Sequence, residues 1–337
     1  MSKYTNDLGL SNAVAKAIME INEEYDSCGW MSVTGLINPP RVHQLKKRHN
    51  DEITEDVADL IWSFFGHMGH LIAERNAGQN VLAEQRFVHE IDGKEISFKP
   101  DRLEKNVGSI PATWTLRDFK ITSVYVLKDA LKGFVKDEWE KQMNLYVYML
   151  RKEGFTVSSI KLEIIARDWR KGESLHSYDY PKHQTAVVDV PIWSEEKQEA
   201  YLKERMKVHL EAESDSDEEL SECTHEERWA THDEWAVVKK DSKPSGQTGL
   251  KKALKRAGHF RSNAEAEAFI NAKIEKMKES KSKNPKPETL KKLEEAAEKE
   301  RASLEVEFRK GTSKRCEDYC TAKPFCNQYR EQINPAF

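Results

Sequence analysis

The segment Trp114-Thr-Leu-Arg-Asp-Phe-Lys-Ile-Thr122, read together with Asp101 upstream, decides how this chain is interpreted. Polar and apolar residues alternate along it, which predicts a β-strand. Residues two apart in a strand project from the same face, so Asp118 and Lys120 are expected side by side. A buried acid and amine are costly unless they are paired or bind a metal. The pattern therefore favours a site where Asp101 and Asp118 hold Mg²⁺ or Mn²⁺ through oxygen and Lys120 faces a phosphate.

The composition predicts a soluble protein with a modest core. The chain has 337 residues, of which 33% are charged and 38% hydrophobic, and its net charge is −4. This balance argues against binding nucleic acid over the whole surface, although it allows a local basic groove. No apolar run approaches the roughly 20 residues that cross a bilayer, and the N-terminus lacks the apolar stretch of a secretion signal. We therefore expect a cytoplasmic protein that does not contact a membrane.

The order of the expected elements indicates an α/β fold with a mixed sheet. Helices are expected at 1–24, 52–76, 136–153 and 194–210, and strands near 81–90, 94–99, 114–122, 160–166 and 185–190. The stretch from Trp30 to Arg41 is expected to be a loop, because two adjacent prolines stop it. Residues 1–210 are therefore expected to form one domain with a short helical part at its start.

The rest of the chain, 211–337, has a different character. Residues 211–222 are acidic and serine-rich and indicate a linker. The stretch 262–310 is highly charged, is broken near Asn284–Pro287, and is typical of a solvent-exposed helical hairpin. We expect this hairpin to be a surface for a protein partner or for self-association, and the C-terminal tail to pack back on the first domain.

Polar residues that suit a metal or a phosphate recur in a fixed order along the first domain. They are His70, Asp101, Asp118, Lys120, Gln142 and Tyr146. His70 ends the motif Gly66-His-Met-Gly-His70, and Gln142 and Tyr146 are four apart, so they share a helix face. This ordered set, over about residues 32 to 193, resembles the PD-(D/E)xK nuclease superfamily. It is most similar to the RecB-like branch, which includes phage exonucleases and CRISPR adaptation nucleases.

The resemblance implies a restriction-endonuclease-like core, a mixed sheet flanked by helices, that hydrolyses DNA phosphodiesters with Mg²⁺ or Mn²⁺. The metal ligands that it implies are His70, Asp101, Asp118 and the backbone carbonyl of Phe119. Lys120 would position or activate the attacking water. Gln142 and Tyr146 would contact the DNA backbone or support Lys120.

The chain departs from the family pattern at two points. Phe98-Lys-Pro stands before Asp101, where the family often has glycine, and the second acid is Asp118, where many members have glutamate. His67 is a nearby alternative to His70 but lies on another face of the helix, and the family spacing selects His70. Glu84, at the start of a strand, either assists the metal or is an ordinary strand residue.

The function implied by the resemblance is a phage-type DNA exonuclease in recombination, repair or degradation of DNA ends, in the host cytoplasm if a phage encodes it. The alternative is a nuclease-fold adaptor that binds DNA without cutting it and docks a partner through the charged helices at 262–310. The motifs do not distinguish DNA from RNA or branched DNA. They also leave open the cleavage polarity, the choice between one strand and two, and the choice between ends and internal bonds.

Five cysteines form the last informative pattern, and three of them, Cys316, Cys320 and Cys326, lie in the final 22 residues. In an intracellular protein such crowding suggests a metal rather than disulfides. Four ligands are usual for zinc or for a [4Fe–4S] cluster. Related nucleases take the fourth from far upstream, which implies Cys223, with Cys28 as the alternative. The resemblance favours a structural iron–sulfur cluster over Zn²⁺.

Overall fold

The structure is a computed structural model that describes residues 3–23, 28–75, 78–246, 249–254, 259–279 and 285–333. The chain divides into two compact units. Unit 1 comprises Met1–Cys223 and Thr321–Phe337, and unit 2 comprises Thr224–Cys320. The second unit is therefore inserted into the sequence of the first, and the division falls at Cys223 rather than at residue 210.

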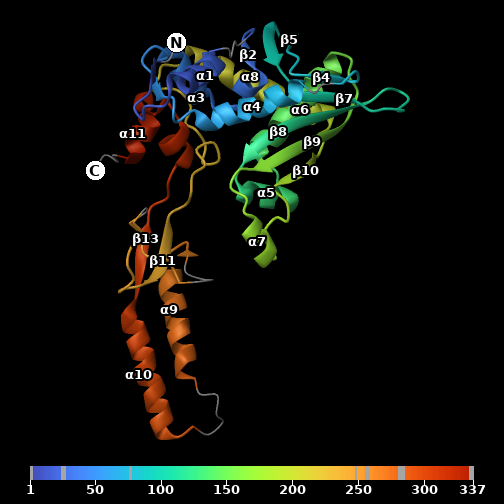
Figure 1. Cartoon of the computed structure of the whole chain (residues 1–337). Helices are drawn as coiled ribbons and strands as arrows, with labels where there is room; N and C mark the ends of the chain where they lie inside the picture. The colour runs from blue at the N-terminus through green and yellow to red at the C-terminus, as the bar shows by residue number, and fades with distance from the viewer. Residues whose placement is uncertain are drawn as a thin grey trace. The chain divides into compact units, whose positions relative to one another are not determined.

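The main sheet of unit 1 has five strands in the order β10 (Thr185–Val190), β9 (Val157–Ala166), β8 (Trp114–Thr122), β7 (Arg102–Lys105) and β4 (Val81–Ala83) (Figure 1). The pair β8 and β9 is parallel, and the other three pairs are antiparallel. The predicted mixed sheet flanked by helices is thus confirmed. The sequence analysis missed the short strand β7.

Strands β8 and β9 form the centre of this sheet because their apolar residues recur with a period of two. Along β9, Ile160, Leu162 and Ile164 are each at most 1% exposed. Leu162 stands beside Asp118 in the parallel register. The acid therefore projects from the same buried face that carries the core.

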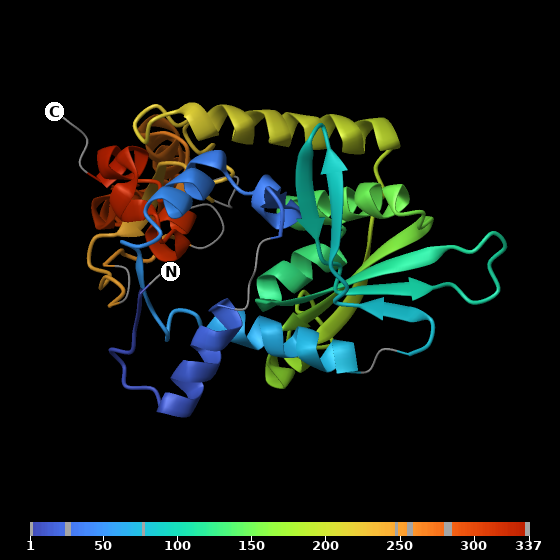
Figure 2. The ribbon, with the colours of Figure 1, turned by 90° about the horizontal axis from the view of Figure 1, so that it is seen from above.

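Helices cover that face of the sheet. Helix α6 (Asp137–Lys152) packs on β9, and α5 (Val124–Leu131), which the sequence analysis missed, packs on β9 and β10. Figure 2 shows α8 (Glu195–Ser214) lying along α6. Acids begin α6 and basic residues end it, which favours the helix through its dipole. A short helix, α7 (Lys171–His176), follows β9.

A second, smaller sheet in unit 1 has the order β2 (Met31–Ser32), β6 (Lys94–Phe98) and β5 (Phe87–Ile91). The chain passes between the two sheets twice. Residues 84–86 connect β4 to β5, and residues 99–101 connect β6 to β7. The polar side chains of both crossings consequently meet between the sheets.

Two predictions for the N-terminal part were wrong. The stretch from Trp30 to Arg41 is not a loop but contains α2 (Val33–Ile37) and the start of α3 (Pro40–Arg48). Ser32 caps α2 by accepting from the amide of Gly35 at 3.0 Å. The proline pair separates the helices, and Pro40 begins α3, where its missing amide hydrogen costs nothing.

The helix predicted at 52–76 begins only at residue 61, as α4 (Ile61–Arg75). Before it, β3 (Thr54–Asp56) pairs with β1 (Lys3–Thr5), and the predicted first helix is α1 (Asn12–Glu23). The Asp56 carboxylate accepts from the Thr5 hydroxyl at 2.8 Å and from the Asp7 amide at 2.7 Å. These contacts keep residues 54–56 in an extended strand, although the apolar pattern of residues 52–76 favours a helix.

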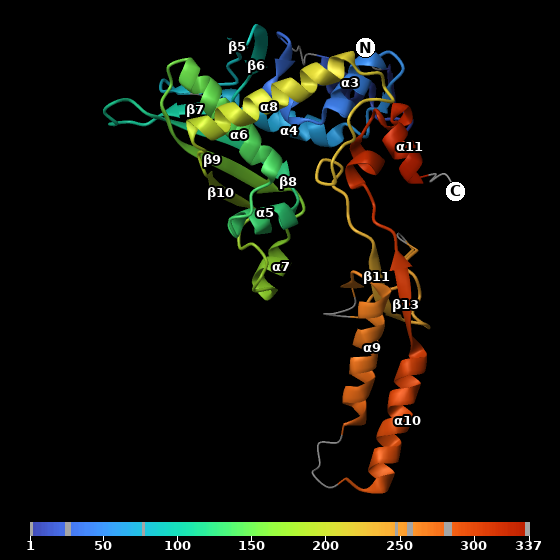
Figure 3. The same cartoon turned by 180° about the vertical axis from the view of Figure 1, so that it is seen from behind.

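Unit 2 contains an antiparallel sheet and two helices (Figure 3). The sheet has the order β12 (His259–Phe260), β11 (Glu234–Lys239) and β13 (Leu304–Arg309), and the helices are α9 (Asn263–Lys278) and α10 (Pro287–Ser303). The prediction of a purely helical segment at 262–310 was therefore wrong at its end, where Leu304, Val306 and their neighbours pair with β11. The helices share a small core with the sheet, built around Val237, Ile270 and Ala297.

The acidic segment and the C-terminal tail are tied to the start of unit 1. Asp217 forms ion pairs with Arg48 at 2.8 Å and with His49 at 2.7 Å. Arg41, only 2% exposed, donates to the carbonyls of Leu220 and Ser221. The tail ends in α11 (Asn327–Ile333), and Asn327 accepts from Arg41. Residues 211–222, expected to be a linker, are thus held against α3.

None of the five cysteines forms a disulfide. Cys223 and Cys326 are buried in unit 1, and Cys316 and Cys320 are partly exposed in unit 2. Cys316 lies within the short π-helix Arg315–Tyr319, and Cys320 follows this helix directly. Within the described ranges, no helix combines the length and apolar character needed to cross a bilayer.

Candidate functional site

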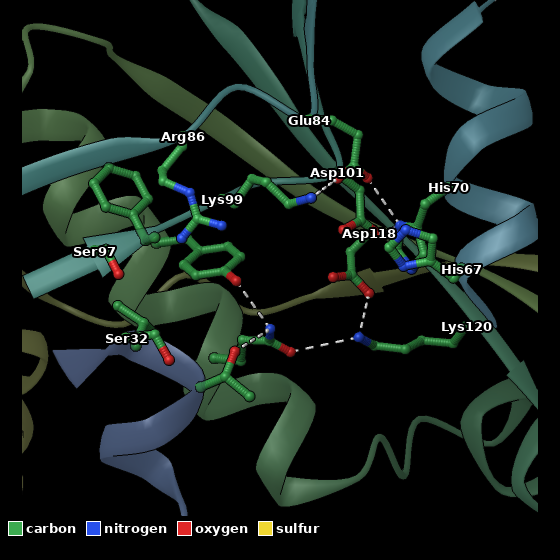
Figure 4. A pocket seen from close by; sticks show the side chains of 15 residues that line it. Ser32, His67, His70, Glu84, Arg86, Ser97, Lys99, Asp101, Asp118 and Lys120 are labelled. Atoms are coloured by element: carbon green, nitrogen blue, oxygen red, sulfur yellow. Dashed lines mark hydrogen bonds and ion pairs between the residues drawn. The ribbon is translucent and has the colours of Figure 1, made fainter. Parts of the chain in front are cut away.

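A pocket of about 190 Å³ opens where the five-stranded and three-stranded sheets of unit 1 meet (Figure 4). Six residues that the sequence analysis selected for catalysis or metal binding line it: His70, Asp101, Asp118, Lys120, Gln142 and Tyr146. They come from α4, the second crossing, β8 and α6. The elements that carry them are far apart in the sequence, so the fold is what brings them together.

An imidazole and two carboxylates meet on one side of the pocket. His70 Nδ1 lies 3.0 Å from Glu84 Oε1 and 3.3 Å from Asp101 Oδ2. The same Asp101 oxygen accepts from the amide of Phe119 at 2.7 Å. Lys99 pairs with the other oxygen of Glu84 at 2.6 Å. His70 contacts both acids, and His67 also lines the pocket.

Glu84 holds its place through an unusual backbone. Its φ of 52° lies in the left-handed region, which costs a non-glycine residue about 1 kcal/mol or more. The residue begins the crossing from β4 to β5, and its amide donates to the Asp101 carbonyl at 3.1 Å. This bond joins the two crossings and sets their carboxylates side by side.

Asp118 and Lys120 occupy the floor of the pocket, next to each other on β8 as the strand pattern predicts. Lys120 Nζ lies 2.7 Å from Asp118 Oδ2. Asp118 is 1% exposed, and its Oδ2 accepts no hydrogen bond of ordinary geometry, so the contact is an ion pair. An oxygen that is buried and incompletely satisfied in this way has capacity for a further ligand.

A chain of polar contacts continues from Lys120 into α6 and α2. Lys120 Nζ donates to Gln142 Oε1 at 3.4 Å, and Gln142 Nε2 donates to the Tyr146 hydroxyl at 3.0 Å. The same nitrogen lies 3.4 Å from the Thr34 hydroxyl. Gln142 thus contacts the lysine directly, and Tyr146 is linked to it through Gln142. The roles that the resemblance implies for both residues stay predictions.

Burial and charge shift the pKa values of these groups. Burial lowers the pKa of His70, but hydrogen bonds to Asp101 and Glu84 outweigh it and raise the value to about 10. Burial, followed by the nearby charge of Asp101, raises the pKa of Asp118 to about 7. Burial also lowers the pKa of Lys120, yet the charges of Asp118 and Asp101 raise it above the usual value. In the site without metal, the acids Asp101, Glu84 and Asp118 therefore lie next to the protonated groups His70 and Lys120.

The donor set fits a divalent cation. His70, Glu84 and Asp101 each offer one atom, and these atoms lie within 4.8 Å of one another. Ligands at right angles around Mg²⁺, each bonded at 2.0–2.1 Å, are about 3 Å apart, close to the observed separations. Oxygen donors with one imidazole suit Mg²⁺ or Mn²⁺ better than a soft metal.

Several lining residues have no role in the predicted set. They are Ser32, Thr34, Glu84, Arg86, Ser97 and Lys99. Glu84 had been weighed as a helper of the metal, but the others carry no motif, and only the fold reveals them. The role predicted for the Phe119 carbonyl stays a prediction, since the contact observed there is made by the amide. The shared metal role of Cys223, Cys316, Cys320 and Cys326 also stays a prediction.

Comparisons with known proteins assign neither family nor function. No family model and no curated protein match the chain. Among solved structures, the crystal structure of SSO0001 is similar with a TM-score of 0.41 and 13% identity, over 59% of this chain and 85% of that one. We draw no conclusion from a likeness this weak.

Proposed function

We propose that this chain is a metal-dependent DNA nuclease of the PD-(D/E)xK type, acting as an exonuclease on DNA ends. The observation that carries the proposal is the convergence of His70, Asp101, Asp118 and Lys120 in one pocket. A restriction-endonuclease-like core is part of the proposal, and the mixed sheet flanked by helices is compatible with it.

The carboxylates hold the cation. Asp101 Oδ2 and Glu84 Oε1 share the proton of His70 in the free site. His70, Glu84 and Asp101, together with Asp118, would hold Mg²⁺ or Mn²⁺, and Lys120 would remain the ion-pair partner of Asp118 Oδ2. When bound, the cation supplies a Lewis acid that stabilises charge on the phosphate and makes water more nucleophilic.

Lys120 orients the attacking water and neutralises charge that builds on the scissile phosphate. Its amine stays protonated, because the paired carboxylate of Asp118 raises its pKa. Its position is fixed from two sides, by Asp118 at 2.7 Å and by Gln142 at 3.4 Å. An ammonium group held in this way does not have to move as the reaction proceeds.

Cleavage assays test the proposal. Purified protein with Mg²⁺ or Mn²⁺ is incubated with end-labelled single- and double-stranded DNA, and with RNA. We expect shortening from the ends, and a loss of at least about 100-fold in Asp118→Asn and Lys120→Ala. Inactivity of the wild type on every substrate under both metals would contradict the proposal.

Matched controls come from the neighbouring edge of the same sheet. Lys161 and Asp189 form an exposed ion pair at 2.6 Å between β9 and β10. Asp189→Asn and Lys161→Ala change the same charges as the two site variants and are expected to cleave like the wild type. Equal losses in all four variants would mean that charge or folding, and not the pocket, controls activity.

The adaptor is the second candidate. We favour the enzyme, because Asp118 and Lys120 form an ion pair in the same pocket as Asp101. DNA binding that is independent of metal and unaffected by Asp118→Asn, without any turnover, would favour the adaptor, with the helices α9 and α10 of unit 2 as the docking surface.

We also propose that Cys223, Cys316, Cys320 and Cys326 bind a structural [4Fe–4S] cluster, with Zn²⁺ as the alternative. The proposal rests on the crowding of Cys316, Cys320 and Cys326 in the sequence. Protein purified without oxygen is expected to be brown and to absorb near about 400 nm. Colourless protein that contains zinc would contradict the iron–sulfur assignment, and protein with neither metal would contradict both.

A further inference from the structure

The pocket has a second side that the proposed hydrolysis does not use. Figure 4 shows Arg86, Ser97 and Ser32 on the opposite side from His70 and Lys120. Arg86 ends the crossing from β4 to β5, and Ser97 and Ser32 stand beside each other on the parallel strands β6 and β2. All three line the pocket.

Arg86 is a cation of the pocket. Among the described residues, its guanidinium has no hydrogen bond and no ion pair. The other two basic side chains of the pocket are paired, Lys99 with Glu84 at 2.6 Å and Lys120 with Asp118 at 2.7 Å. Arg86 therefore contributes a positive charge that no carboxylate of the pocket neutralises.

Ser97 is an independent second observation. The residue is fully buried and lines the pocket, and its hydroxyl has no hydrogen-bond partner within the described part of the chain. A buried hydroxyl left unpaired costs free energy, so a bound group that pairs with it would be stabilised. Ser32 lies next to it in the strand register, and its oxygen already accepts from the Gly35 amide, which leaves its hydroxyl hydrogen to donate.

An unpaired guanidinium beside two hydroxyl donors suits a phosphoryl group. Arginine presents several N–H donors in a planar fork that matches phosphate oxygens. We propose that Arg86, Ser97 and Ser32 form a phosphate-binding subsite, which holds a phosphoryl group of the DNA strand other than the one being cut. The inference rests on the proposed function for the choice of DNA as ligand. The group is either the terminal phosphate of the strand or an internal phosphodiester.

Binding measurements without metal test the subsite separately from cleavage. The probes are two 12-nucleotide single strands with a fluorophore at the 3′ end, one with a 5′-phosphate and one with a 5′-hydroxyl. Fluorescence anisotropy is measured in EDTA, so that no strand is cut. Inorganic phosphate serves as a competitor.

Arg86→Gln is expected to weaken binding about 10- to 100-fold, and Ser97→Ala by less than about 10-fold, because charged hydrogen bonds are the stronger ones. Arg86→Lys, which keeps the charge but not the fork, should recover part of the loss. A loss confined to the 5′-phosphorylated strand, with competition by inorganic phosphate, identifies the terminal phosphate. An equal loss on both strands identifies an internal phosphodiester.

The matched control is Arg170→Gln, since the Arg170 side chain is 77% exposed and pairs only with Glu173 among the described residues. It changes the net charge equally and should leave binding within about twofold of the wild type. Unchanged binding in Arg86→Gln, or a loss no larger than in Arg170→Gln, overturns the subsite. Circular dichroism and thermal unfolding show that each variant is folded. Binding that depends on Arg86 in a protein that cuts nothing would overturn the proposed hydrolysis and leave the subsite standing.

Discussion

The Lys120 amine is the group on which the proposed chemistry most depends, and Gln142 holds it in place. Gln142→Leu removes an acceptor for Lys120 and one of the hydrogen-bond partners of the buried Tyr146 hydroxyl, which keeps its contact with Thr34. We expect kcat to fall about 10-fold with little change in KM, and the free energy of unfolding to fall by about 1–3 kcal/mol. Steady-state cleavage kinetics and urea unfolding measure the two effects.

Tyr146→Phe is the matched comparison for that prediction. It removes one hydroxyl but leaves the contact between Gln142 and Lys120 intact. We expect it to cost about 1 kcal/mol of stability and to keep most of the activity. A loss of activity as large as that in Gln142→Leu would show that the lysine is not positioned through the glutamine.

His70 makes the stability of the metal-free protein depend on pH. Its pKa is about 10 in the folded chain and about 6.5 in an unfolded one. Between these values the folded state keeps a proton that the unfolded state releases. The stabilisation is therefore complete below about pH 6.5 and is lost as the pH rises toward 10. Thermal unfolding in EDTA should show a Tm that falls as the pH is raised from 7 to 10. The Tm of the His70→Gln variant should fall less steeply over the same range.

The sequence predicts those site residues that belong to a spaced motif. Asp118 and Lys120 are two apart on a strand, so their common face follows from the period of two. Arg86 and Ser97 belong to no pattern, and their importance depends on a buried hydroxyl and an unpaired charge, which exist only after folding. A single sequence contains no signal for either.

At the scale of elements, helix α8 positions helix α2. It thereby also positions Thr34, the residue of α2 whose hydroxyl lies near Gln142 in the pocket. Arg205 of α8 donates to the carbonyls of Leu36 and Asn38 at 2.8 and 2.6 Å, just where α2 ends. His209 Nε2 lies 3.0 and 3.1 Å from the same two oxygens. Burial and the charge of Arg205 lower the pKa of His209 to about 4, so the ring is neutral at pH 7.

Arg205→Met should therefore loosen α2 while it keeps most of the side-chain volume. We expect the free energy of unfolding to fall by about 2 kcal/mol, since two bonds from a charged donor are lost. Cleavage should fall less than in Gln142→Leu. Urea unfolding and cleavage rates measure both effects, with Lys203→Met, two residues earlier on the same helix, as the exposed control. Equal stability of both variants would show that Arg205 does not hold α2.

Long elements with a clear period were predicted and short ones were not. The strand β8, the helix α6 and the strand β10 agree with the sequence to within about a residue. The helix α2 has only five residues, too few to show a period of 3.6, and its start depends on the cap by Ser32. The strand β7 is likewise defined by its partners rather than by its own four residues.

At the scale of the whole molecule, unit 2 is an insertion between two parts of unit 1. The main core of unit 1 lies entirely between residues 31 and 206, and unit 2 has its own small core. Composition alone predicts a change of character after residue 210. The sequence analysis expects the tail to return to unit 1, but composition does not specify the buried contacts that hold it there, such as the paired bonds between Cys223 and Gln328, each 2.9 Å long.

These contacts predict that unit 1 folds without unit 2. The amide and the carbonyl of Cys223 both bind Gln328, so the chain leaves unit 1 close to the tail that completes it. Closing that gap with a short flexible linker costs little, because loop-closure entropy grows slowly with length. A chain whose residues 232–311 are replaced by about eight Gly and Ser residues keeps Cys223, Cys316 and Cys320, and it joins Thr231 to Thr312, whose backbones are hydrogen-bonded. It should unfold in one cooperative transition and keep the Asp118-dependent cleavage. Gln328→Ala in the shortened chain, which breaks both bonds, should lower its Tm by several degrees. A shortened chain that unfolds without cooperativity would show that the core of unit 1 depends on residues of unit 2.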